Sequence, residues 1–118
     1  MAGTVCEAAR VLDRGGSLCI CVSHPVTDMG SFIGDDADAA FTLRRPYFDR
    51  SRVEDTVHVD GLTMTFRGWT YTLEDYFLAL ERAGLVTEAV REPRPTGAGR
   101  YERWRSVPLF LNLRAVKS

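Results

Sequence analysis

The sequence lacks the features that mark several classes of protein. No apolar run approaches the ~20 residues that span a bilayer, so we expect no membrane protein. The 15 Lys and Arg residues nearly balance the 16 Asp and Glu residues, and a net charge of −1 gives no general attraction to polyanions. The first residues carry no basic cluster and apolar core of the secretory type, so we expect a cytoplasmic protein. Its 118 residues suit one compact domain.

Cysteine is scarce, with three residues. Because this number is small and odd, the sequence does not fit the disulfide framework of a small secreted domain. Cys19 and Cys21 lie inside an apolar run, and we expect both to be buried thiols. The ligand pairs of a zinc site are missing, so we expect no metal. The acidic residues Asp35, Asp36 and Asp38 lack the spacing and closing Glu of a helix-loop-helix calcium site, which favours a solvated loop.

Charge is distributed unevenly along the chain. Residues 1–90 carry a net charge of −6, and residues 91–118 carry +5, from seven Arg or Lys and two Glu. One short segment mixes guanidinium groups with rings, as binders of single-stranded nucleic acid do: Arg100, Tyr101, Arg103, Trp104 and Arg105. The alternative is a solvated loop with some rings packed against the body. Without a recognisable binding motif we expect the loop and no nucleic-acid partner.

The first half of the pattern predicts a layered α/β fold. Residues 4–12 place apolar side chains on one helical stripe, and Gly15-Gly16 supplies the exit from that helix. Residues 17–23 are apolar without alternation, which is typical of a strand covered on both faces. The strand stops at His24-Pro25, and the ends of such strands are where open α/β sheets bind ligands.

The middle of the chain combines an irregular segment with a hairpin. Residues 26–52 are rich in Gly and Asp and predict a loop or lid. Asp60-Gly61 between two alternating runs predicts a two-residue turn. The resulting register places five apolar side chains on one face: Val57, Val59, Leu62, Met64 and Phe66. His58 lies on the opposite face, so we interpret it as a surface residue rather than a catalyst.

The last third predicts a helix and two strands. Residues 72–84 begin with a Thr-x-x-Asp capping pattern, carry one apolar stripe and end at glycine. Residues 85–92 are a strand candidate that ends at Pro93. In residues 108–116 the side chains of Leu109, Leu111, Leu113 and Ala115 fall on one face, which predicts a strand. The Gly-containing tip at 96–99 lacks the spacing of a phosphate-binding loop.

These elements in this order resemble the C-terminal half of a class I S-adenosylmethionine-dependent methyltransferase. The segment from Glu7 to Leu18 is similar to the family's helix, "L-x-P-G-G" turn and fifth strand, although Arg14 stands where the family has proline. Three further segments are similar to the next helix with its "A-G-F" turn, the sixth strand and the last antiparallel strand: Trp69-Thr70-Tyr71-Thr72-Leu73 through Ala83-Gly84-Leu85, Glu92-Pro93-Arg94-Pro95, and Pro108-Leu109-Phe110-Leu111-Asn112-Leu113-Arg114-Ala115.

The resemblance implies an α/β fold for residues 1–118: the last strands of a partial Rossmann-like methyltransferase sheet, with an antiparallel terminal strand. Residues 26–71 would form an insertion that holds the β-hairpin. In the family, a glycine-rich loop and an acidic residue in the preceding half hold the cofactor, S-adenosylmethionine, and nothing in this sequence matches them. We therefore expect a methyltransferase fragment that is inactive alone, acts on a small-molecule methyl acceptor when complete, and has no cofactor-binding residues of its own.

The resemblance also implies site residues and a partner. Ser23, His24 and Pro25 would face the acceptor, with His24 as a base or, alternatively, as a residue that only orients the loop. Trp69 and Tyr71 would wall the acceptor pocket, against the alternative of aromatic core packing. The strand at 17–23 would have an open edge, which predicts a homodimer. The competing hypothesis is a free-standing α+β binding or dimerisation module.

Overall fold

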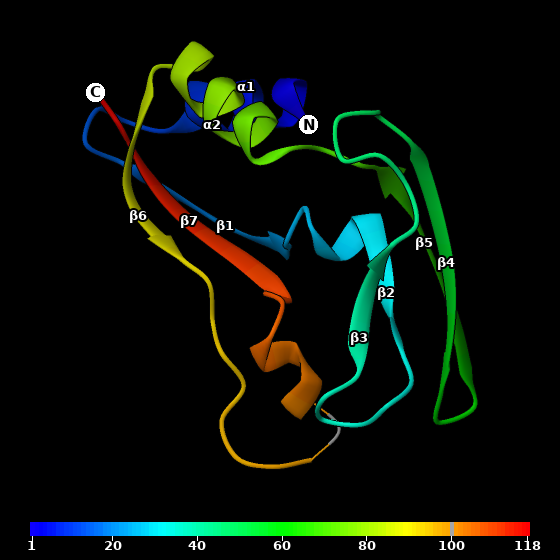
Figure 1. Ribbon diagram of the computed structural model, residues 1–118. Helices are drawn as coiled ribbons and strands as arrows, with labels where there is room; N and C mark the ends of the chain where they lie inside the picture. The colour runs from blue at the N-terminus through cyan, green and yellow to red at the C-terminus, as the bar shows by residue number, and fades with distance from the viewer. Residues whose placement is uncertain (100) are drawn as a thin grey trace.

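The computed structural model describes residues 1–99 and 101–118, so Arg100 of the basic segment lies outside the described residues. The two long helices and the strands follow one another along the chain as Figure 1 shows, with two short 3-10 turns, η1 and η2. The elements are α1 (Ala2–Val11), β1 (Ser17–Ser23), η1 (Thr27–Met29), β2 (Gly30–Ile33), β3 (Ala40–Leu43), β4 (Arg52–Val59), β5 (Leu62–Trp69), α2 (Leu73–Arg82), β6 (Leu85–Arg91), η2 (Glu102–Arg105) and β7 (Phe110–Lys117).

The largest sheet has three strands in the order β1-β7-β6. The central strand β7 is antiparallel to both neighbours, so β1 and β6 run parallel to each other without touching. Ser23 at the end of β1 pairs with Phe110, and Arg91 at the end of β6 pairs with Asn112. The carboxyl ends of the two parallel strands therefore lie at the same end of the sheet, on either side of β7, and we call this end the carboxyl edge.

Both helices cover one face of this sheet, at the end opposite that edge (Figure 1). The Thr72 side chain and the Asp75 side chain form the predicted capping box at the start of α2, and Gly84 ends the helix with a φ of 72°. The predicted helices and terminal strand are confirmed. The buried core between helices and sheet consists of Val5, Ala9, Ala79, Leu80, Leu85, Leu111, Leu113 and Ala115.

The described residues leave the opposite face of the sheet uncovered, and this corrects the prediction for β1. Leu18, Ile20 and Val22 pack against the core, whereas Cys19 and Cys21 are exposed. The two thiols point to the same side, because residues two apart on a strand share a face. The prediction of buried thiols was wrong because the apolar run indicated burial on both faces, and the described residues cover one. The outer edge of β1 likewise has no neighbouring strand in the described part of the chain.

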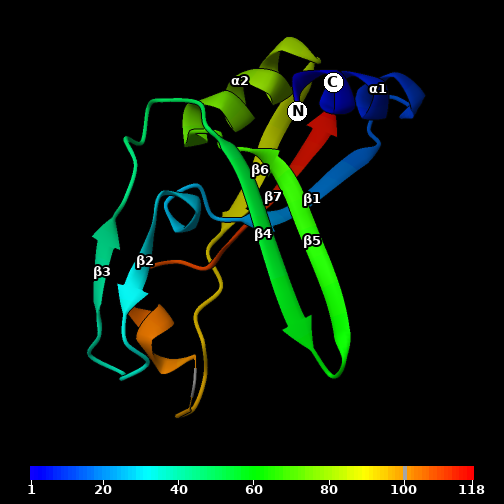
Figure 2. The ribbon, with the colours of Figure 1, turned by 90° about the vertical axis from the view of Figure 1, so that its right-hand side faces the viewer.

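The segment between β1 and α2 forms two hairpins that reach away from the sheet (Figure 2). The β4–β5 register, with Val57 opposite Met64 and Val59 opposite Leu62, is the predicted one. Its apolar face is exposed along its length. The prediction of a loop at 26–52 was wrong in part, because β2 and β3 pair there and place Phe32 opposite Phe41. No helix among the described residues is long and apolar enough to cross a bilayer.

Candidate functional site

The carboxyl edge of the sheet joins β1 and β6 through two side chains. His24 follows β1 and Glu92 follows β6, and their Nε2 and Oε2 atoms lie 2.8 Å apart. His24 is 93% buried as a side chain, whereas Glu92 is about half exposed. The His24 backbone N–H also donates to the Leu109 carbonyl before β7 begins. One histidine therefore ties the chain at the ends of all three strands.

Both ring nitrogens of His24 have partners within the protein. The backbone N–H of Val26 donates to Nδ1 over 3.2 Å, which leaves Nε2 as the protonated nitrogen that donates to Glu92. A base must reach the proton it takes, and here the free lone pair is already used. Of the two roles expected for His24, this bonding favours the one in which it orients the turn after β1.

The other residues expected at this strand end differ in what they offer a ligand. Pro25 is fully buried, whereas Ser23 is exposed on the uncovered face of the sheet. Thr27 fixes the following turn, because its hydroxyl donates to the Pro108 carbonyl over 2.8 Å. Of Ser23 and Pro25, only Ser23 therefore has surface that a ligand could contact. The Thr27 hydrogen bond holds the turn that leads to Asp28 in place.

Asp28 lies on η1, and no motif in the sequence marks it as a site residue. Burial raises the pKa of its carboxyl group above 3.8, the charge of Asp55 raises it further, and Arg45 opposes both. Burial likewise raises the pKa of the Tyr76 hydroxyl, and the charge of Asp28 is the next cause. Asp28 on η1 and Tyr76 on α2 are thus two half-buried groups whose pKa values are both raised, and such groups are candidates for functional residues. The signal for Asp28 was its position four residues after His24.

Tyr71 and Trp69, expected as pocket walls, have different environments. The Tyr71 ring packs edge-on against Tyr76 with 5.9 Å between centroids, and the Arg50 guanidinium lies 5.2 Å from its centre. Trp69 ends β5 and is 54% exposed. Tyr71 therefore belongs to the group around Asp28 and Tyr76, whereas Trp69 neither packs in the core nor joins that group.

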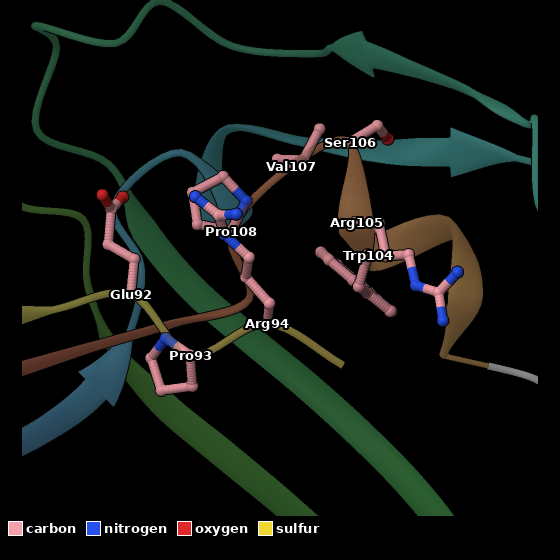
Figure 3. Close-up of a pocket in the computed structure, with 8 residues that line it drawn as sticks. All are labelled: Glu92, Pro93, Arg94, Trp104, Arg105, Ser106, Val107 and Pro108. Atoms are coloured by element: carbon pink, nitrogen blue, oxygen red, sulfur yellow. The ribbon is translucent and has the colours of Figure 1, made fainter. Parts of the chain in front are cut away.

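A cavity of about 200 Å³ lies beside the His24–Glu92 pair. Figure 3 shows Arg94 extending from the segment after β6 towards Pro108, between Glu92 and Trp104. The cavity is lined by Glu92, Pro93, Arg94, Trp104, Arg105, Ser106, Val107 and Pro108. Trp104 belongs to the basic segment, and its ring packs edge-on against Phe32 with 4.7 Å between centroids, as the alternative of rings packed against the body predicted.

The described residues do not fit the adenosyl group of S-adenosylmethionine. A nucleoside site of this fold needs a glycine-rich turn that leaves a strand and opens a helix. Here β1 continues into His24-Pro25 and β6 into Glu92-Pro93, and the element that follows each strand is a short 3-10 turn rather than an α-helix. Among residues 1–99 and 101–118 there is also no cluster of three or more metal-ligating side chains. The described residues therefore lack the elements that would hold the nucleoside of the methyl donor.

No protein-family model matches the sequence, and no curated protein matches it significantly. Solved structures do. A Listeria monocytogenes protein assigned to the S-adenosylmethionine-dependent methyltransferases superposes with a TM-score of 0.76 at 21% identity, covering 100% of this chain and 55% of its own. An S-adenosylmethionine-dependent methyltransferase of Mesorhizobium loti gives 0.70 at 22% identity, covering 98% of this chain and 55% of its own.

A third solved structure is the glycopeptide N-methyltransferase MtfA with S-adenosyl-L-homocysteine, with a TM-score of 0.53 at 16% identity. It matches over 99% of this chain and 47% of its own. At these identities the likeness establishes the fold. The chain resembles S-adenosylmethionine-dependent methyltransferases throughout its length and spans about half the length of each, consistent with the expected C-terminal half.

Proposed function

We propose that this chain is the C-terminal part of a cytoplasmic S-adenosylmethionine-dependent methyltransferase that methylates a small molecule, and that it is inactive alone. The missing part would complete a Rossmann-like sheet and hold the cofactor, which supplies the methyl group. Residues 26–71, with both hairpins, would be an insertion into this domain. The observation that carries the proposal is the match of the whole chain to about half of each methyltransferase structure.

Two features of the sheet support the missing half independently. The outer edge of β1 has no partner strand among the described residues, and an unpaired edge recruits another strand. The face that carries Cys19 and Cys21 has no helix over it among the described residues, although the continuous apolar run of β1 is typical of a strand covered on both faces. A preceding half that supplies a neighbouring strand and covering helices would satisfy both.

Within this proposal the chain's own residues bind and orient the acceptor. Methyl transfer depends on holding two reactants in line, with a nearby base when the acceptor loses a proton. We assign His24 to positioning, through Glu92 and Val26, and Asp28 to proton acceptance beside Tyr76. Ser23 and Tyr71 would contact the acceptor. Pro25 would shape the turn and Trp69 would border the site from the hairpin.

The test joins the chain to the segment encoded immediately upstream of Met1. If that frame encodes a strand, a Gly-x-Gly loop and a helix, the joined protein is expected to convert S-adenosylmethionine to S-adenosylhomocysteine with small-molecule acceptors. The chain alone, as the control, is expected to give none. An unrelated upstream frame, or a joined protein that folds and transfers no methyl group, contradicts the proposal.

A second candidate function, self-association as a dimerisation module, is favoured by two observations. The β4–β5 hairpin exposes a continuous apolar face, and β1 leaves an edge open, so two surfaces of the isolated chain are suited to another protein chain. We infer a homodimer through the open edge of β1 in the absence of the missing half. Under the methyltransferase proposal this association is a consequence of the missing half, and under the alternative it is the function.

A further inference from the structure

A second cavity, of about 380 Å³, is lined by Arg94 and Trp104, which also line the cavity in Figure 3. Aromatic and aliphatic groups make up most of its wall, which is formed by Pro93, Arg94, Pro95, Thr96, Tyr101, Trp104, Leu109 and Phe110. Small-molecule sites fall in this range of volume and combine apolar walls with a few polar groups. Three residues line both cavities, Pro93, Arg94 and Trp104, so the two cavities are neighbours.

The aromatic wall is held in place before any ligand arrives. The Trp104 ring packs edge-on against Phe32, and the Arg103 guanidinium lies 5.4 Å from the centre of the same Phe32 ring. Arg103 also forms an ion pair with Asp35 at 2.6 Å. These contacts tie the segment after β6 to β2, so the Trp104 ring is positioned for stacking. Rings prefer edge-on or offset arrangements with other rings, and Trp104 offers its remaining surface to the cavity.

Arg94 gives the cavity its charge. Arg103 pairs with Asp35 and Arg105 with Glu102, whereas Arg94 makes no ion pair with any residue in the described part of the chain. The carboxylate of Glu92 accepts from His24 instead. The surrounding segment is basic, because residues 91–118 carry a net charge of +5. An unpaired guanidinium beside aromatic rings in a basic segment suits a carboxylate on a flat apolar body.

We propose that this cavity binds an aromatic carboxylate, with its ring against Trp104 and Phe110 and its carboxylate on Arg94. The inference rests on the proposed function, since it identifies the chemical class of the methyl acceptor. The neighbouring cavity in Figure 3 shares Arg94 and Trp104 with this one and is lined by Glu92, the partner of His24. The acceptor specificity would then come from the segment between β6 and β7.

The test uses the chain itself and needs no methyl transfer. Cinnamate, and cinnamamide as the uncharged control of the same shape, are titrated into the nitrogen-labelled chain and followed by two-dimensional NMR. The two indole N–H signals report on Trp104 and, as an internal control, on Trp69. Cinnamate is expected to shift the Trp104 signal and leave the Trp69 signal in place. Cinnamamide is expected to bind about tenfold more weakly, because it lacks the charge-assisted pair.

Two variants test whether the Arg94 guanidinium binds the carboxylate of cinnamate. Arg94→Gln is expected to weaken cinnamate binding about tenfold, to the level of cinnamamide. Arg91→Gln is the matched control, because Arg91 lies three residues earlier and lines a different cavity on the uncovered face, and it is expected to change the affinity less than twofold. The rest of each spectrum verifies that both variants fold.

The proposal is overturned if cinnamate leaves the Trp104 signal unmoved, if both ligands bind equally, or if Arg94→Gln binds cinnamate like the parent chain. These outcomes separate from the methyl-transfer test. If the chain binds cinnamate but the joined protein transfers no methyl group, the binding site is supported and the proposed function is contradicted. Methyl transfer without cinnamate binding would retain the function and remove the cavity.

Discussion

The side chain of His24 links two strands that share no hydrogen bond, because its Nε2 atom lies 2.8 Å from Oε2 of Glu92 while β7 separates β1 from β6. The pair therefore closes the carboxyl edge of the sheet across its central strand. It also fixes the direction in which the chain leaves β1 towards Asp28. A structural linkage of this kind has consequences for stability that differ from those of a catalytic base.

Replacing His24 by Ala is expected to lower the free energy of unfolding by about 2 kcal/mol, because a buried ring and two hydrogen bonds are lost. Glu92→Gln is expected to cost less than half of this, since its amide oxygen accepts the same bond. Urea denaturation followed by circular dichroism measures both values. Glu88→Gln is the control, because it disturbs only an exposed ion pair with Arg114. A His24→Ala variant as stable as the parent would show that the linkage is dispensable.

The stability of the protein is expected to depend on the ionisation of Asp28. Its folded-state pKa is raised above 3.8, mainly by burial, so the folded protein binds this proton more tightly than the unfolded chain does. This group's contribution to stability is therefore greatest at low pH and is lost as the pH rises through the folded pKa. Asp28→Asn removes the charge and is expected to be more stable than the parent at pH values above that pKa.

The measurement for Asp28 is the difference in unfolding free energy between parent and Asp28→Asn across acidic to neutral pH. The difference is expected to grow in favour of the variant as pH rises. Asp38→Asn is the matched control, since Asp38 is exposed on a loop, and it is expected to show no such trend. A difference that is constant with pH, or that shrinks as pH rises, contradicts the assignment.

Self-association of the isolated chain is expected to involve β1. Cys21→Lys places a charge on the uncovered face of this edge strand, and charged residues on edge strands oppose pairing with another chain. The variant is expected to shift the population towards monomer in size-exclusion chromatography with light scattering. Cys6→Lys makes the same substitution at an exposed position on α1 and is expected to leave association unchanged. The proposed interface is contradicted if the parent chain is a stable monomer at dilution, or if the two variants associate to the same extent.

Local chemistry was sufficient to predict most of the elements. Asp60-Gly61 determined the hairpin register, because both residues adopt a positive φ that favours such a turn, and Thr72 with Asp75 determined where α2 begins. The pairing of β2 with β3 was missed, because four-residue strands carry too little alternation to be recognised. The exposure of Cys21 was missed for a different reason. An apolar strand predicts that both of its faces are covered, and the described residues cover one face only.

The site was predicted less well than the fold. His24 was identified from its place at the strand end, but its partner Glu92 lies 68 residues away and only the sheet order brings them together. Asp28 belonged to a segment interpreted as a loop, so its position four residues after His24 was a signal for the site but did not indicate that its carboxyl group is half-buried. Trp104 appeared as part of a basic segment, and its role in a cavity wall depends on Phe32 from a distant hairpin.

The central claim is that this chain is one half of a methyltransferase whose donor pocket lies in the other half. Isothermal titration of S-adenosylhomocysteine tests it most directly, with the chain alone and the chain joined to its upstream segment measured side by side. The account predicts saturable binding by the joined protein and none by the chain alone. Binding by the chain alone, or no binding by a folded joined protein, would contradict it.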